Sequence, residues 1–62
     1  MLKEQAREAI IREWLALPRQ ERRSDLQAGW FAMKIKDQYH FKADGDRYQV
    51  IKGFLVNYLD RP

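Results

Sequence analysis

A chain of 62 residues holds one domain, residues 1–62, and the absence of cysteine excludes both a disulfide and a zinc site built on thiolates. No run approaches the roughly 20 apolar residues that span a bilayer, and no apolar segment typical of a signal peptide follows Met1. The net charge of +3 is within the range that keeps a small domain soluble. We therefore expect a complete cytoplasmic protein without a membrane partner.

Stability is the first difficulty for so short a chain, because folding buries only about 60% of the surface that the unfolded chain exposes. Without disulfides, an aromatic-rich core or self-association has to supply the missing stability. Each aromatic side chain can bury roughly 150–250 Å². The sequence contains these aromatic residues: Trp14, Trp30, Phe31, Tyr39, Phe41, Tyr48, Phe54 and Tyr58.

The first predicted element is a helix over residues 2–17. Its apolar residues recur at intervals of three and four, as on one helical face: Leu2, Ala6, Ala9, Ile10, Trp14 and Leu17. Pro18 ends this helix, because proline has no amide hydrogen to donate to the preceding turn. Residues 18–23 are too polar for burial, and we expect them to form one exposed helical turn.

A second helix is predicted from Ser24, because Ser24 and Gln27 have the spacing of a capping box. Two apolar stripes follow: Leu26, Trp30 and Met33, and Ala28, Phe31, Ile35 and Tyr39. Together they make the helix apolar over most of its circumference, which predicts a central, buried helix. Gly29 interrupts it at a cost of about 1 kcal/mol relative to alanine, so we expect it to let another helix approach closely.

The third element is predicted as a helix that Asp46 caps and that continues to residue 59. Its apolar residues form one inner face: Tyr48, Ile51, Phe54, Leu55, Tyr58 and Leu59. The remaining residues lie on the outer face: Gln49, Lys52, Gly53, Asn57 and Asp60. The predicted fold class is therefore all-α, a small three-helix domain.

An alternative α+β fold replaces the third helix by a C-terminal β-hairpin. The odd-numbered positions from Phe31 to Phe41 are mostly apolar, which is the period of a strand, and Asp44-Gly45 is a typical hairpin turn. Residues 42–50 would then look like the wing of a winged-helix domain. We favour three helices, because the first strand would be rich in lysine, aspartate and glutamine, which are poor strand residues.

The sequence offers little for catalysis. Ser24 is the only serine, His40 is the only histidine, and threonine and cysteine are absent, so a nucleophile with an activating base is not available. The aspartates near His40 do not have the order of a calcium loop, and no glycine-rich phosphate loop occurs. We therefore predict no enzyme activity, no metal site, no cofactor and no small-molecule substrate.

One functional hypothesis is nucleic-acid binding, as in a DNA-binding regulatory protein. The whole excess of positive charge lies in residues 18–42, and a localised basic surface indicates an anionic partner. Lysine and arginine would contact phosphates, and Gln27 would contact a base edge. The candidate residues are Arg19, Arg22, Arg23, Gln27, Lys34, Lys36, Lys42 and Arg47.

The favoured hypothesis is a protein-interaction or regulatory module that acts through an aromatic-rich apolar surface. The large apolar side chains exceed what a core of this size encloses, and an apolar patch left outside marks a partner surface. The candidate interface residues are Trp14, Trp30, Phe31, Phe54 and Tyr58. We therefore predict a protein partner or a homodimer. Phosphate binding weakens steeply with salt, which distinguishes the two hypotheses.

Overall fold

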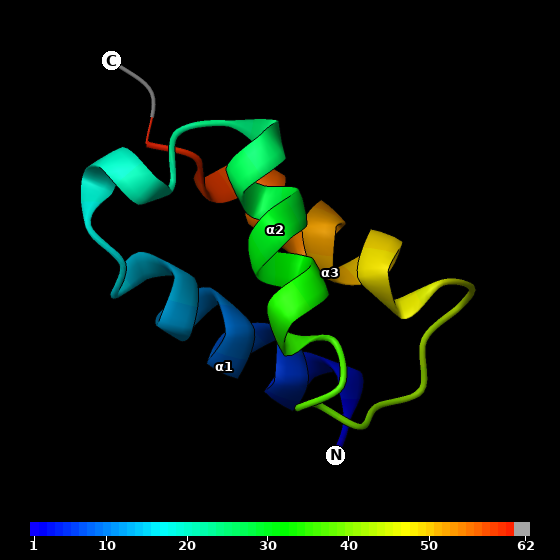
Figure 1. The fold of residues 1–62 in the computed structure, drawn as a ribbon. Coiled ribbons are helices and arrows are strands. Elements are labelled where there is room, and N and C mark those ends of the chain that lie inside the picture. Colours follow the sequence, from blue (N-terminus) through cyan, green and yellow to red (C-terminus); the bar gives the residue numbers. More distant parts are fainter. Residues whose placement is uncertain (61–62) are drawn as a thin grey trace.

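The computed structural model describes residues 1–60, which form helices joined by short turns and one longer loop (Figure 1). The α-helices are α1 (Lys3–Leu15), α2 (Asp25–Ile35) and α3 (Arg47–Leu55). Two short 3-10 helices are η1 (Arg19–Glu21) and η2 (Val56–Tyr58). The predicted small three-helix, all-α fold is confirmed.

The alternative fold with a C-terminal hairpin is wrong, since none of residues 1–60 is in a strand. The segment expected to form the first strand is divided between the end of α2 and the loop 36–46. Helix capping at Ser24 and at Asp46 fixes the starts of α2 and α3 on either side of that segment. Gly45 does occupy a turn, with φ of 104°, but this turn leads into α3 instead of joining two strands.

The first helix buries one face and begins later than predicted. Ala6, Ile10 and Trp14 are four residues apart, lie on one side of α1, and are each 0% exposed. Leu2 was expected on the same face but is 70% exposed, because it precedes the first helical turn. The helix ends before Pro18, and η1 forms the predicted exposed turn.

The capping box predicted at the start of α2 is present. The Ser24 hydroxyl accepts a hydrogen bond from the Gln27 amide at 3.2 Å, and Oε1 of Gln27 accepts one from the Ser24 amide at 3.1 Å. These bonds satisfy amides that the first turn of a helix otherwise leaves unpaired. The helix that follows buries Ala28, Ala32 and Ile35.

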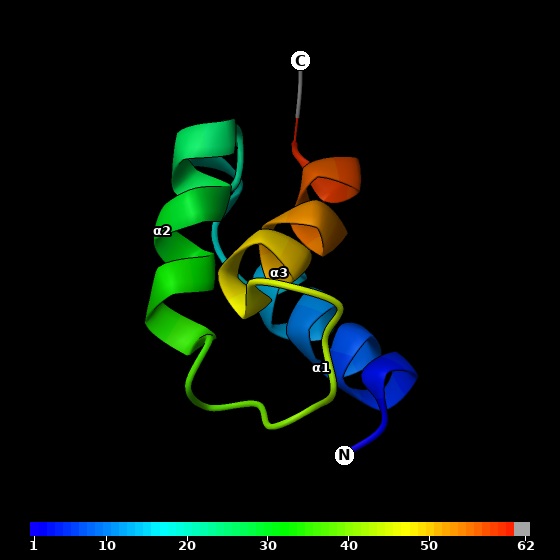
Figure 2. The ribbon, with the colours of Figure 1, turned by 90° about the vertical axis from the view of Figure 1, so that its right-hand side faces the viewer.

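The expectation that α2 is buried over most of its circumference is wrong. Leu26, Trp30 and Met33 are 61%, 63% and 59% exposed. Figure 2 shows the reason, because α1 and α3 both lie on one side of α2. The buried side of α2 carries the small residues Ala28, Gly29 and Ala32, which let neighbouring helices come close. In the part of the chain that the structure describes, no further helix covers the opposite side.

Gly29 has the role that the sequence predicted for it, which is to admit a close helix neighbour. A Cβ atom at this position would lie 2.8 Å from the Tyr48 hydroxyl oxygen, so the glycine makes room for a side chain of α3. The start of α3 is fixed by Asp46, whose carboxylate accepts a hydrogen bond from the Tyr48 amide at 3.0 Å. Ile51 and Leu55 are the fully buried residues of α3.

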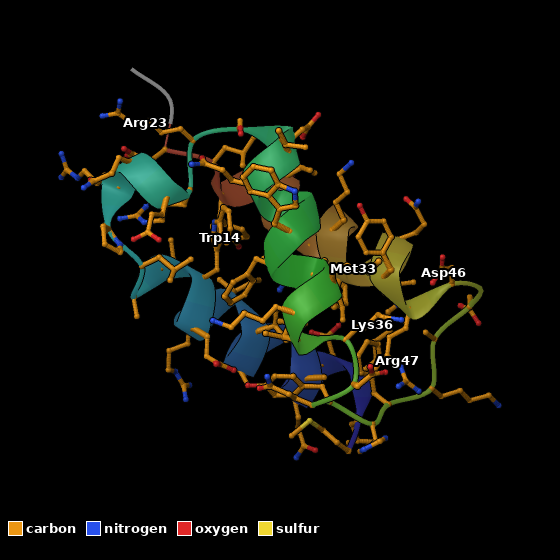
Figure 3. All side chains as sticks on the ribbon, in the orientation of Figure 1. Trp14, Arg23, Met33, Lys36, Asp46 and Arg47 are labelled. Carbon is orange, nitrogen blue, oxygen red and sulfur yellow. The ribbon has the colours of Figure 1, made fainter. Side chains whose placement is uncertain are left out.

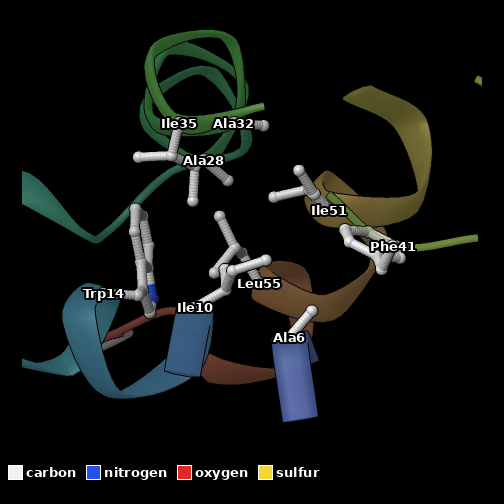
Figure 4. Packing of buried hydrophobic residues seen from close by; sticks show 9 residues of the cluster. All are labelled: Ala6, Ile10, Trp14, Ala28, Ala32, Ile35, Phe41, Ile51 and Leu55. Atoms are coloured by element: carbon white, nitrogen blue, oxygen red, sulfur yellow. The ribbon is translucent and has the colours of Figure 1, made fainter. Parts of the chain in front are cut away.

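The core forms between the three helices, with the indole of Trp14 at one side of it (Figure 4). The Trp14 ring meets Phe31 of α2 edge to face, with ring centroids 5.4 Å apart. Its Nε1 donates a hydrogen bond to the Tyr58 carbonyl oxygen at 2.9 Å. The buried members of the core are Ala6, Ile10, Trp14, Ala28, Ala32, Ile35, Phe41, Ile51 and Leu55.

The loop 36–46 is held to the helices by aromatic contacts. Phe41 is 5% exposed and packs with Phe54, their ring centroids 6.2 Å apart. The Arg47 guanidinium lies 5.7 Å from the centroid of the Phe41 ring and donates to a backbone oxygen of the loop. The Tyr39 hydroxyl donates a hydrogen bond to the Glu13 carboxylate of α1.

Substitutions at two glycines test the close approach of α3 to α2. Gly53→Ala meets nothing within 4 Å, so we expect it to raise the free energy of unfolding by up to about 1 kcal/mol through helix propensity. Gly29→Ala is expected to gain less or to lose stability, because Tyr48 has to move. In a Tyr48→Phe background, which lacks the hydroxyl, Gly29→Ala should raise the free energy of unfolding about as much as Gly53→Ala does. Urea denaturation measures all three effects, and equal gains at both glycines without Tyr48→Phe would contradict the packing described.

The hydrogen bond between Tyr39 and Glu13 predicts a stability that depends on pH. This bond and partial burial raise the pKa of Tyr39 above its ordinary value of 10.0. The raised pKa means that the stabilisation is fully present below about pH 10 and is lost as the pH rises through the folded-state pKa. Tyr39→Phe should therefore cost up to about 1 kcal/mol at neutral pH. In urea denaturation from pH 8 to 11.5, a cost that stayed constant would rule out this bond.

Candidate protein-interaction surface

Three large apolar side chains line the outer side of α2. Leu26, Trp30 and Met33 follow one another at intervals of four and three residues, so they form one stripe along the helix. Each is about 60% exposed. We call this stripe the α2 face. An ordered row of large exposed apolar side chains, unlike single scattered ones, marks an interaction surface.

The α2 face is directed outward by the residues on the other side of the same helix. Ala28 and Ala32 are 0% exposed and Ile35 is 2% exposed, and they pack into the core with α1 and α3. Residues spaced by two or five positions from these point to the opposite side of a helix. Because Ala28, Ala32 and Ile35 face the core, the α2 face points to solvent.

Open hollows lie on both sides of Trp30. One, of about 370 Å³, is lined by Leu17, Glu21, Gln27, Trp30, Phe31 and Lys34. The other, of about 240 Å³, is lined by Asp25, Leu26, Gly29, Trp30, Met33, Tyr48 and Lys52. Trp30 thus forms a ridge between two depressions. A facing helix can place its own side chains in such depressions, as ridges pack into grooves between helices.

The residues predicted to form a protein interface are divided between core and surface. Trp14 is fully buried, so its indole is not accessible to a partner. Phe54 and Tyr58 are half-buried against the core, and Phe31 is half-buried but reaches the larger hollow. Trp30 is the predicted interface residue that is mainly exposed.

The predicted interface residues did not include Leu26 and Met33, because an apolar surface over most of a helix predicts a buried helix. A signal was present in the sequence. One side of α2 combines Ala28, Gly29 and Ala32, and small residues are typical of the side on which helices approach closely. The bulky stripe on the other side then has no place in a core built from only two further helices.

The residues predicted to bind nucleic acid do not form one surface. Figure 3 shows Arg23 toward one end of α2 and Lys36 and Arg47 toward the other. Arg19 and Arg23 are exposed near the start of α2, with Arg23 Nε 3.9 Å from a carboxylate oxygen of Asp60. At the other end Lys34 and Lys42 are exposed and Lys36 is half-buried.

Three of these polar residues are engaged in intramolecular contacts. Gln27 holds the start of α2, and its Nε2 also donates to the Gln20 carbonyl at 2.7 Å, so its amide serves the cap. Arg22 Nε donates to the Leu17 carbonyl at 3.0 Å. The Arg47 guanidinium packs on Phe41. The predicted wing, residues 42–50, is divided between the end of the loop 36–46 and the first turn of α3, and it contains no strand.

Residues 1–60 contain no group of three histidine, cysteine, aspartate or glutamate side chains that could hold a metal ion. In the same part of the chain, no helix has both the length and the apolar character needed to cross a bilayer. No known protein family, curated protein or solved structure matches this chain.

The two tryptophans give a direct test of the exposed α2 face. Trp30 should be quenched efficiently by acrylamide and Trp14 should be shielded, because their exposed fractions are 63% and 0%. Trp30→Phe should remove the quenched component and change the free energy of unfolding by no more than about 0.5 kcal/mol. Trp14→Phe should cost about 2 kcal/mol through lost packing and a lost hydrogen bond. Shielding of Trp30 at low protein concentration would contradict the exposed stripe.

Proposed function

We propose that this chain is a small, non-enzymatic protein-interaction module of the regulatory or adaptor kind, and that it binds its partner through the α2 face. The observation that carries the proposal is the exposure of Leu26, Trp30 and Met33 in one row, with a hollow on each side of Trp30. Tryptophan at the centre of an apolar patch is a frequent anchor of protein interfaces.

The partner element is an amphipathic helix. Apolar residues at intervals of three and four on α2 form a ridge that matches the groove between rows of side chains on another helix. Strand addition is not supported, since residues 1–60 contain no strand whose edge could be extended. A helix with apolar residues at i, i+4 and i+7 would place them on both sides of Trp30.

The free energy gained by burying the α2 face, compared with the free-energy cost of association, indicates a weak, reversible interaction. Full burial of a large apolar side chain is worth about 1.5–3 kcal/mol, so covering the exposed parts of these three contributes on the order of 5 kcal/mol. Association costs about 4–15 kcal/mol in lost freedom of motion. The apolar row alone therefore does not hold a tight complex, and charged groups around it decide the affinity and the choice of partner.

Nucleic-acid binding has less support. Its candidate residues lie at the two ends of α2, and the row between them is apolar. Phosphate contacts need lysine and arginine side chains that follow the backbone of the nucleic acid over a continuous surface. The end with Arg19, Arg22 and Arg23 provides the control in the experiment below.

A library of amphipathic helical peptides, displayed on phage and selected on the immobilised chain, tests the proposal. We expect enriched peptides with apolar residues at i, i+4 and i+7. Trp30→Gln should weaken their binding at least about tenfold, because it removes the central anchor. Leu15→Gln is the matched control, since Leu15 is a 45% exposed apolar residue of α1 outside the α2 face.

The outcomes separate the two hypotheses. Peptides that bind Trp30→Gln as strongly as the original chain would contradict the proposal. The triple variant Arg19→Ala, Arg22→Ala, Arg23→Ala should leave peptide binding unchanged. In a parallel titration with mixed DNA and RNA, salt-sensitive binding that this triple variant abolishes would instead favour the nucleic-acid hypothesis.

A further inference from the structure

We propose that the helix that covers the α2 face is α2 of a second copy of this chain, packed antiparallel about a two-fold axis near Trp30. This inference rests on the proposed function, because it names the partner of the same surface. A two-fold interface uses one patch on both subunits, so the patch has to be complementary to itself. Both the apolar row and the charges around it meet that condition.

The apolar row is almost symmetric about its centre. Leu26 lies four residues before Trp30, and Met33 lies three residues after it. When a second α2 runs in the opposite direction, Leu26 faces Met33 of the second copy, and Trp30 lies beside Trp30 of the second copy. Leucine and methionine have similar volumes, so the Leu26–Met33 contacts at the two ends of the interface occupy similar space. Each tryptophan ring also meets a hollow at the side of the other.

Acidic side chains border the α2 face toward one end of α2, and basic side chains lie toward the other end. Glu21 and Asp25 are at its N-terminal end, and Lys34 and Lys36 are in or directly after its last turn. Glu21 and Lys34 border the same hollow. Asp25 and Lys36 are eleven residues apart, close to three full helical turns, so they lie on one side of α2.

Antiparallel packing therefore pairs acid with base on each side of the apolar row. Glu21 faces Lys34 of the second copy on one side, and Asp25 faces Lys36 of the second copy on the other. A parallel arrangement would bring carboxylates to carboxylates and ammonium groups to ammonium groups. Like charges placed opposite one another disfavour the wrong arrangement, so the charge pattern selects the antiparallel one.

Arg19, Arg22 and Arg23 also lie near the N-terminal end of α2, but none of them lines either hollow beside Trp30. Arg22 donates from its Nε to the Leu17 carbonyl, and the Arg23 Nε lies 3.9 Å from the Asp60 carboxylate, so both are directed to other parts of the chain. Lys52 does oppose the pairing of acid with base, because it borders the smaller hollow beside Gly29. It would lie near the axis, opposite Lys52 of the second copy, and its repulsion would limit the affinity.

The size of the surface predicts a weak dimer. A standard interface buries about 800 Å² on each partner, which would be close to a fifth of the 4390 Å² surface of this chain. The apolar part of this interface consists of three side chains on each copy. We therefore expect a dimer in the micromolar range, populated at high local concentration and open to competition by other amphipathic helices.

Cysteine cross-linking measures the direction of the packing, and the chain has no cysteine of its own to interfere. Leu26→Cys and Met33→Cys are mixed, with one of them tagged, and oxidised at a concentration at which the chain self-associates. We expect the disulfide between position 26 and position 33 of the second copy to form at least several-fold faster than either symmetric disulfide. Faster symmetric disulfides would show parallel packing and would overturn the inference.

Charge reversal gives an independent test by sedimentation velocity. Glu21→Lys alone and Lys34→Glu alone should each weaken self-association roughly five- to tenfold, because each places two like-charge pairs at the interface. The chain with both reversals should recover the original affinity. Trp30→Gln should abolish self-association, and Leu15→Gln should leave it unchanged. Circular dichroism of each variant checks that the helices are intact.

The failures of this inference and of the proposed function are distinguishable. A chain that stays monomeric up to millimolar concentration, while peptide binding still depends on Trp30, would overturn the second copy as partner and leave the interaction module intact. Self-association that Trp30→Gln does not affect would also overturn the antiparallel α2 pair. A Lys52→Gln variant that self-associates more tightly would support the position of the axis.

Discussion

The position of Trp14 is the constraint on which the rest of the structure depends. Its indole fills the space between the helices, meets Phe31 of α2 edge to face and donates a hydrogen bond to the Tyr58 carbonyl beyond α3. One side chain of α1 thereby contacts both α2 and η2. In a chain too short for a large core and without disulfides, such a buried aromatic group supplies much of the available apolar burial.

The exposed α2 face follows from that packing. α1 and α3 occupy the same side of α2, the side of Ala28, Gly29 and Ala32, because only small residues admit neighbours so closely. Within residues 1–60 no further α-helix covers the other side. The row of Leu26, Trp30 and Met33 is therefore what remains when a helix with two apolar sides is packed in a domain that can cover only one.

The charges near α2 connect helix stability with recognition. Asp25 in the first turn and Lys34 in the last turn each complement the helix dipole, which is a local benefit of a few tenths of a kcal/mol. The same residues place an acidic side chain beside one end of the α2 face and a basic side chain beside the other. A surface of this kind pairs favourably with its own reversed copy, so a feature that stabilises the monomer also favours the antiparallel dimer that we propose.

Local signals in the sequence determined the elements of this protein, whereas tertiary packing decided which surfaces are exposed. Ser24 with Gln27, Asp46 and Pro18 mark helix ends through hydrogen bonds or steric limits that act within a few residues, and the structure has helix ends at each of them. The roles of Trp14 and Trp30 could not be separated in this way, because both occupy apolar positions on helices. Only the side of α2 to which α1 and α3 pack assigns one tryptophan to the core and the other to the surface, and that choice depends on contacts between distant segments.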